Sequence, residues 1–145
     1  MLKFLERGNF LDALHAFGSE KPIFGTCAGA ILLAREVRHP AQTSLGLLDA
    51  VVERNAYGRQ IDSSILTAPT SLGPEPLEMV FIRAPRILET GPDVEILAHR
   101  DEFPVLVRQQ GRGQNQIWAA TFHPELSQDR RVHKLFVEAV RNEKG

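Results

Sequence analysis

The single cysteine of this 145-residue chain, Cys27, lies between two glycines, Gly25 and Gly29. The apolar residues 23–24 before it predict a short strand, and an amphipathic helix is expected from Ala30 onward. A nucleophile on a sharp turn between a strand and a helix has the geometry of a nucleophile elbow, here with Cys in place of the Ser of hydrolases. The two glycines leave room for a strained backbone and for close helix packing. They favour a reactive thiol over the alternative, a buried structural cysteine.

The electrostatics of this turn also bear on the reactivity of Cys27. A helix that begins just after the thiol directs its free N–H groups and the positive end of its dipole toward it. Such surroundings lower a thiol pKa. We therefore expect more thiolate at neutral pH than a free cysteine would have.

A thiolate nucleophile needs a base, and the base needs a third group that fixes its tautomer. His123 directly follows a predicted buried strand and has an acid two residues later, Glu125. The strand period of two places these side chains on one side of an extended chain, and Pro124 stiffens the arrangement. We expect Glu125 to accept one imidazole N–H while the other nitrogen faces Cys27. The alternative is a structural histidine at a strand end. The remaining histidines are given no role: His15, His39, His99 and His133.

Two arginines are placed where they would meet a carboxylate ligand. Arg54 ends a predicted strand, and its planar fork suits a carboxylate. Arg83 closes another strand, at the carboxyl end where α/β sheets bind ligands. The alternative for both is a solvated side chain or a pair with a local acid.

The composition is that of a globular protein, with 43% hydrophobic and 24% charged residues and a net charge of −1. Near-neutral charge gives no sign of nucleic-acid binding, and no apolar run has the length of a membrane span. One cysteine cannot form an internal disulfide, which favours a reducing cytoplasm, and it excludes metal sites built from several cysteines. The length fits a single domain over residues 1–145.

Hydrophobic periodicity predicts an α/β order of elements. A helix is expected over residues 2–18, broken near 8–9 and ending at Gly18, and a final helix over residues 129–142 with one apolar face. The predicted strands cover residues 47–54, 61–67 (an edge strand), 77–82, 94–99, 104–109 and 116–122. Residues 69–76 are expected to form a loop, and 111–115 a hairpin turn.

Four segments together closely resemble the PdxT/SNO glutaminase subunits of pyridoxal 5′-phosphate synthase, which are class I (triad) glutamine amidotransferases. They are residues 21–34 (KPIFGTCAGAILLA), 54–60 (RNAYGRQ), 81–85 (FIRAP) and 122–126 (FHPEL). The resemblance implies a flavodoxin-like, three-layer α/β fold with a mixed central sheet. It also implies that Cys27 is the nucleophile, His123 the general base and acid, and Glu125 its orienting partner.

The same resemblance implies the substrate and the partner. Arg54, Ile82 and Arg83 match positions that hold L-glutamine, and the Ala28 N–H matches an oxyanion donor. The implied reaction is hydrolysis of glutamine to glutamate and ammonia, without a cofactor. The ammonia passes to a separate synthase subunit of the PdxS/SNZ type, whose docking activates the glutaminase.

The chain departs from the family pattern at its start. Family members open with two strands and a Gly-Gly-Glu-Ser run that supplies substrate contacts and a second oxyanion amide, and this run is not found here. We therefore expect Met1 to be an internal methionine and the chain to be a fragment lacking its N-terminal strands. Two alternative functions stay open: an inactive fragment that only binds a partner, or another Cys-His-Glu hydrolase such as a γ-glutamyl hydrolase.

Overall fold

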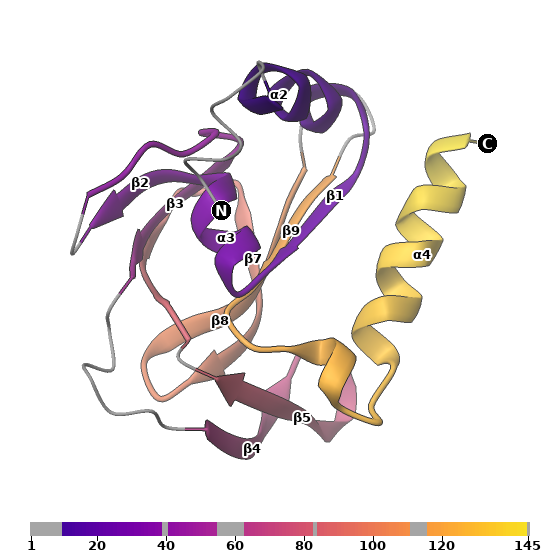
Figure 1. Ribbon diagram of the computed structural model, residues 1–145. Helices are drawn as coiled ribbons and strands as arrows, with labels where there is room; N and C mark the ends of the chain where they lie inside the picture. Colours follow the sequence, from indigo (N-terminus) through magenta and orange to yellow (C-terminus); the bar gives the residue numbers. More distant parts are fainter. Residues whose placement is uncertain (1–9, 39–40, 55–62, 83, 111–115, 145) are drawn as a thin grey trace.

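The computed structural model describes residues 10–38, 41–54, 63–82, 84–110 and 116–144. The helices in this part of the chain are α2 (Phe10–Glu20), α3 (Ala28–Leu33) and α4 (Arg131–Lys144), with a 3₁₀ turn, η2 (Pro124–Leu126). The strands are β1 (Ile23–Thr26), β2 (Ala34–Arg38), β3 (Leu48–Glu53), β4 (Ser63–Thr70), β5 (Gly73–Ile82), β6 (Arg86–Thr90), β7 (Val94–Arg100), β8 (Phe103–Gln110) and β9 (Gln116–Ala120). Their arrangement is a mixed α/β fold (Figure 1).

The strands form two sheets. The larger has the order β1-β9-β8-β7-β4-β5, and the smaller has the order β2-β3-β6. In the larger sheet β1 is parallel to β9, and every other neighbouring pair is antiparallel. Strands β1, β9, β7 and β5 therefore share one direction, and their carboxyl ends lie at the same side of the sheet. This is the side where an α/β sheet offers a ligand site.

The larger sheet is curled rather than flat. Its strands β4 and β7 are joined through a single residue pair, Thr70 and Ala98. Beyond this weak junction the β4–β5 hairpin swings round, as the lower part of Figure 1 shows. The curl brings the end of β5 close to the residues that follow β1 and β9, as the hydrogen bonds of the site show below.

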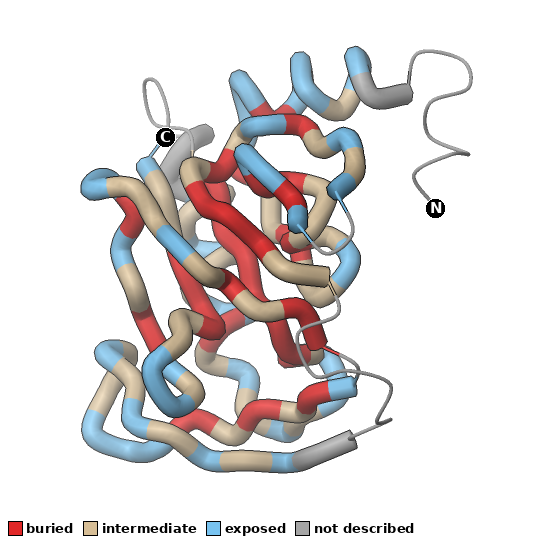
Figure 2. Tube along the Cα trace, turned by 90° about the vertical axis from the view of Figure 1, so that its left-hand side faces the viewer, coloured by how far each residue is buried: buried red, intermediate tan, exposed pale blue. Residues whose placement is uncertain are grey.

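The central strands of the larger sheet are buried on both faces, as the red strands of Figure 2 show, whereas the β4–β5 hairpin is partly exposed. Strand β9 alternates between two cores, because successive side chains point to opposite faces. Ile117 and Ala119 belong to the core shared with α3 and the smaller sheet. Trp118 and Ala120 belong to the core shared with β5, β7, β8 and α4. The centre of the sheet, including β9 next to β1, is therefore packed on both sides.

Helix α4 confirms the expected apolar face. Val132 is buried, and the side chains at 135, 136, 139 and 140 are half-buried, whereas the others between 132 and 141 are exposed. An aromatic cluster anchors the helix to the sheet, with ring centroids of Phe136 5.3 Å from Phe24 and 6.0 Å from Trp118. Because Phe24 is in β1 and Trp118 in β9, α4 braces the two strands that lead to the site.

The expected end of the first helix was wrong. Helix α2 continues through Gly18 to Glu20, and Lys21 N–H still donates to Phe17 O at 2.8 Å. Gly18 is not a helix terminator but a packing residue, since a Cβ atom there would lie 2.4 Å from Leu47 Cδ1. The part of the prediction that falls on residues 1–9 lies outside the described residues.

The helix after Cys27 is much shorter than expected. It begins at Ala28, two residues before the expected Ala30, and ends at Leu33, after which residues 34–38 form β2, which pairs in parallel with β3. Ala34 and Val37 are buried in the strand while Arg35 and Glu36 are exposed. The three-residue spacing of the two buried positions is that of a helix, so tertiary pairing with β3, with a register shift between Ala34 and Glu36, overrode the local pattern.

The predicted strands at 47–54, 61–67, 77–82, 94–99, 104–109 and 116–122 correspond to β3, β4, β5, β7, β8 and β9. The loop expected at 69–76 was wrong, because β4 and β5 form a hairpin that turns at 71–72. Pro74 and Pro76 are tolerated because β5, not β4, is the edge strand. Strand β6 was not predicted, and the hairpin turn expected at 111–115 lies outside the described residues. No helix of the described part is both long and apolar enough to cross a bilayer.

Candidate active site

Cys27 alone separates β1 from α3, and its backbone is strained. Its φ and ψ are 52° and −107°, a positive φ that non-glycine residues rarely adopt. The turn is fixed from both sides: Cys27 N–H donates to Ala120 O at 2.8 Å, and Cys27 O accepts from Ala30 N–H at 3.0 Å. Strain of this kind persists only where the surroundings enforce it. The structure therefore gives Cys27 the backbone of a nucleophile elbow.

The two flanking glycines have different roles. A Cβ atom at Gly25 would lie 2.6 Å from the backbone of Gly29 and 2.7 Å from Leu33 Cδ1, so Gly25 permits close packing of α3 on β1. A Cβ atom at Gly29 would meet nothing within 4 Å. The expectation of tight packing is thus confirmed for Gly25 and wrong for Gly29, which borders open space next to Cys27.

The thiol of Cys27 donates to the backbone carbonyl oxygen of Ile82 at 3.9 Å. Burial raises the pKa of this thiol above its ordinary value, the nearby Glu125 carboxylate raises it further, and the Ala28 N–H opposes both by lowering it. The expected lowering of the pKa was therefore wrong. The helix of six residues that follows Cys27 does not outweigh the loss of water around the sulfur.

The base and its orienting partner are joined as expected. His123 Nδ1 lies 2.6 Å from Glu125 Oε1. Because a carboxylate only accepts hydrogen bonds, Nδ1 carries the proton, and in the neutral imidazole Nε2 is then the acceptor nitrogen. The contact is made through the 3₁₀ turn η2, in which Pro124 is buried, rather than through an extended chain.

The triad candidates meet where parallel strands end. Cys27 follows β1, and His123 lies three residues beyond β9, whose last residue, Ala120, pairs with Thr26. His123 N–H donates to Val80 O at 2.7 Å, two residues before Ile82 on β5. The carbonyl groups at 80 and 82 thus hold the base and the thiol from one strand.

Nucleophile and base are brought near each other without a direct bond. Among the described residues, the Cys27 thiol makes its hydrogen bond to Ile82 O, and the His123 ring makes its hydrogen bond to the Glu125 carboxylate. The electrostatic effect of Glu125 on the thiol shows that the two groups share one site. In a ligand-free site such catalytic contacts are often long, and a rotation of the Cys27 side chain would turn the sulfur away from Ile82.

The residues expected to hold glutamine are placed only in part. Ile82 is 37% exposed, at the edge of the site. Arg54 follows β3 in the smaller sheet, and its N–H donates to Arg38 O at 3.0 Å. Within the described residues the structure gives no contact between Arg54 and the triad. Arg83 lies outside the described residues.

Sequence reasoning missed three groups that hold the site. They are the carbonyl groups of Ala120 and Val80, and a polar cluster after His123 formed by Ser127, Asp129 and Arg131. Backbone carbonyl groups carry no sequence signal of their own. The acid–base spacing of two residues between 129 and 131 was a signal, but it resembles an ordinary helix start.

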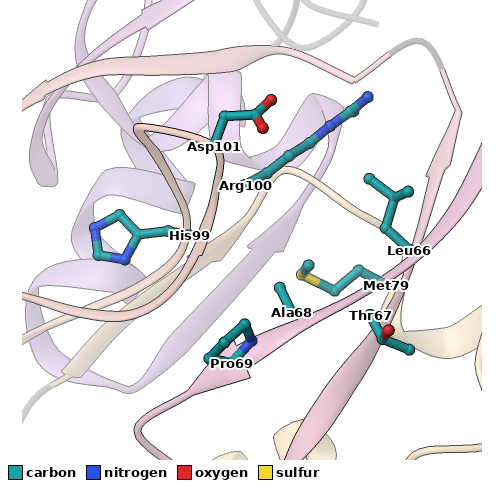
Figure 3. A pocket seen from close by; sticks show the side chains of 8 residues that line it. All are labelled: Leu66, Thr67, Ala68, Pro69, Met79, His99, Arg100 and Asp101. Atoms are coloured by element: carbon teal, nitrogen blue, oxygen red, sulfur yellow. The ribbon is translucent and has the colours of Figure 1, made fainter.

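A hollow of about 580 Å³ lies between β4 and the turn from β7 to β8. Leu66 and Met79 form part of its wall, with His99, Arg100 and Asp101 above them. Figure 3 shows the His99 ring turned away from the Arg100 and Asp101 side chains. These polar groups do not converge on one point, and the hollow contains none of the triad candidates. Among the described residues, no three His, Cys, Asp or Glu side chains gather as metal ligands.

Solved structures define the class of protein to which this fold belongs. A crystal structure described as that of a glutamine amidotransferase matches with a TM-score of 0.82 and 41% identity, over 96% of this chain and 72% of that one. A putative GMP synthase component from Thermoplasma acidophilum matches with a TM-score of 0.64 at 16% identity, over 96% of this chain and 68% of that one, and shares the fold. The fold is that of the class I glutamine amidotransferases.

Sequence comparison narrows the class to one family. Residues 1–142 match the SNO glutamine amidotransferase family. The pyridoxal 5′-phosphate synthase subunit PdxT of Koribacter versatilis is 57% identical over 97% of this chain and 70% of its own length. The PdxT subunit of Thermotoga neapolitana is 45% identical over 97% of this chain and 73% of its own length. The chain belongs to the SNO glutamine amidotransferase family.

Proposed function

We propose that this protein is the glutaminase subunit of a pyridoxal 5′-phosphate synthase. It hydrolyses L-glutamine to L-glutamate and ammonia, and it delivers the ammonia to a synthase subunit of the PdxS type. The observation that carries the proposal is the strained Cys27 elbow facing the hydrogen-bonded pair of His123 and Glu125, in a chain of this family. The reaction takes place in the cytoplasm, where a lone thiol stays reduced.

The catalytic roles follow from the atoms that the site presents. His123 Nε2 takes the thiol proton, and Cys27 Sγ attacks the side-chain carboxamide carbon of glutamine. The tetrahedral oxyanion accepts a hydrogen bond from the Ala28 N–H, which already points toward the sulfur. His123 then protonates the leaving nitrogen, and ammonia departs from the thioester. A water molecule, deprotonated by His123, hydrolyses the thioester to glutamate and restores the thiol.

Glutamine is held by the remaining candidates. The open space beside Gly29 and the exposed end of β5 at Ile82 leave room for a small substrate next to the sulfur. Arg54 and Arg83 are proposed to bind its α-carboxylate. A guanidinium fork suits a carboxylate through two parallel hydrogen bonds.

The resting thiol is poorly activated, which fits a glutaminase that is switched on by its partner. Its pKa is raised by burial, and its proton is directed to Ile82 rather than to His123. Docking of the synthase subunit is proposed to release the thiol from Ile82 and turn it toward Nε2.

The test is the release of ammonia and glutamate from L-glutamine, measured with and without a PdxS-type synthase. We expect turnover that requires the synthase and that is lost in C27S and H123N. The same assay with γ-glutamyl peptides distinguishes a γ-glutamyl hydrolase. Lack of ammonia release, together with failure of a glutamine-mimicking electrophile to label Cys27, would refute the proposed function for this chain.

A further inference from the structure

The outer side of the edge strand β5 is covered by the segment that follows the proposed base. At one end, His123 N–H donates to Val80 O at 2.7 Å. Farther along, Ser127 Oγ donates to Glu78 Oε1 at 2.8 Å. From His123 to Ser127 the residue number on the segment rises, whereas from Val80 to Glu78 the residue number of the partner on β5 falls. Residues 123–131 therefore run antiparallel along β5, in the place of a neighbouring strand (Figure 1).

Arg131 ends this segment with four side-chain hydrogen bonds. Its Nη1 donates to Glu75 O at 2.9 Å, and its Nη2 donates to Pro76 O at 2.8 Å. Its Nε and Nη2 also donate to the two carboxylate oxygens of Asp129, at 3.0 and 2.7 Å. One planar guanidinium thus joins the start of α4 to two successive carbonyl groups of β5.

The site of attachment explains why an arginine is used. Pro76 has no N–H, so a regular ladder of backbone hydrogen bonds cannot continue along this part of β5. The arginine fork supplies N–H donors to carbonyl groups that a strand would otherwise bond. The ion pair of Arg131 and Asp129 is also shielded from water, because the two side chains are only 27% and 17% exposed. The pairs of Arg35 with Asp49 and Arg38 with Glu36 are more exposed, at 42–53%.

A continuous run of short-range hydrogen bonds connects the arginine to the base. Leu126 N–H donates to His123 O at 3.1 Å, and Asp129 N–H donates to Ser127 Oγ at 3.0 Å. Arg131 N–H then donates to Asp129 Oδ1 at 3.2 Å. Ser127 N–H also donates to Pro124 O at 3.2 Å, so hydrogen bonds link the whole segment, and we expect a displacement at Arg131 to reach His123.

We propose that Arg131, held by Asp129, is a positioning residue of the glutaminase site: it fixes residues 123–131 in register on β5 and thereby aims His123 at Cys27. The catalytic part of this inference rests on the proposed function. The structural part does not, because it rests on the hydrogen bonds of Arg131 to Glu75 O and Pro76 O. Strand β5 also contacts the thiol, through Ile82 O. The register of one strand then sets the positions of both base and nucleophile.

The first experiment measures steady-state glutaminase kinetics with the PdxS-type synthase in excess, for wild type, R131Q, R131K and the control R130Q. Arg130 is exposed and lies next to Arg131. We expect kcat to fall about 100-fold in R131Q and about 10-fold in R131K, with KM changed less than about 3-fold, since small misplacements of catalytic groups have effects of this size. R130Q should stay within about 2-fold of wild type. Wild-type kcat in folded R131Q would overturn the proposal.

The second experiment measures hydrogen exchange at the backbone amides of the free chain, and it is independent of activity. Loss of the arginine fork should speed exchange at His123 and across residues 124–131 by at least about 10-fold, while Val107 in the core stays protected. Equal acceleration at all amides would instead indicate global destabilisation and would contradict a positioning role. If wild type releases no ammonia, the proposed function fails. Unchanged protection of His123 in R131Q would then separately overturn the register role.

Discussion

The Cys27 sulfur and the Ile82 carbonyl oxygen lie 3.9 Å apart. Cys27 follows β1 and Ile82 ends β5, although these two strands form opposite edges of the six-stranded sheet. The curl of the sheet closes this gap and places β5 against the elbow. The same closure buries the thiol, and burial, with the nearby Glu125 carboxylate, raises the pKa of Cys27.

The strained backbone of Cys27 predicts an unusual order of stability among inactive variants. Its φ of 52° suits glycine better than any residue with a Cβ atom. We expect C27G to be more stable than C27A by about 1 kcal/mol, the lower end of the range for such strain. Urea denaturation monitored by circular dichroism measures the difference. Equal stability, or a more stable C27A, would show that the turn is not strained in solution.

The two glycines beside Cys27 predict opposite responses to alanine. In G25A the new methyl group would meet Gly29 and Leu33, and we expect a loss of about 1–3 kcal/mol in the free energy of unfolding, as for an overpacked core. In G29A the new methyl group would point into open space from a position in α3. Because alanine has a higher helix propensity than glycine, we expect the free energy of unfolding to rise by up to about 1 kcal/mol. Denaturation midpoints compare the two variants. The matched substitution in one turn controls for general effects of alanine, and a stable G25A would contradict the close approach of α3 to β1.

The chemistry of the site was easier to predict from the sequence than its supports. Cys27, His123 and Glu125 belong to residue types that carry out nucleophilic catalysis, and their local settings mark them. The strand β2 was missed because the three-residue spacing of the apolar Ala34 and Val37 is typical of a helix, not of an alternating strand. The conformation depends instead on the parallel pairing with β3, a tertiary interaction that the local pattern of residues 34–38 does not show.

The same limit applies to the electrostatics of the thiol. A sequence shows that a helix follows Cys27, but not that the helix ends after six residues or that the sulfur is shielded from water. The role of β5 as an edge strand is likewise a property of the whole sheet order. The hydrogen bonds of Arg131 to Glu75 and Pro76 depend on that order, so local spacing alone does not reveal them.

We expect the replacement of Glu125 by glutamine to have opposite effects on the reactivity of the thiol and on glutamine turnover. The carboxylate disfavours the thiolate, so its removal should lower the pKa of Cys27 and speed alkylation by iodoacetamide at a given pH. Glutamine turnover should fall about 100-fold or more, because His123 loses the group that fixes its tautomer. The pH dependence of alkylation and the rate of ammonia release measure the two effects.

The control for E125Q is E138Q, which removes the same charge from an exposed position on α4. It should change neither alkylation nor turnover by more than about 2-fold, as is usual for surface substitutions. If both rates fall in E125Q, the variant has disturbed the elbow. If both rise, Glu125 is not the orienting partner of His123.

The ion pair of Asp129 and Arg131 predicts a loss of stability in acid. Hydrogen bonds from Arg131 hold the pKa of Asp129 below its ordinary value of 3.8 in the folded chain. The folded state therefore favours the ionised carboxylate of Asp129. Its contribution to the free energy of unfolding is complete above pH 3.8 and is lost as the pH falls through the lower pKa of the folded chain.

At pH 7 we expect D129N to be less stable than wild type by about 1–3 kcal/mol, as for hydrogen bonds to a charged group. The difference should shrink between about pH 4 and pH 2, where wild type is protonated as well. Urea denaturation across this range measures it, with D93N at an exposed turn as the control. A difference between D129N and wild type that stays constant down to pH 2 would show that the carboxylate charge does not stabilise the attachment of Arg131 to β5.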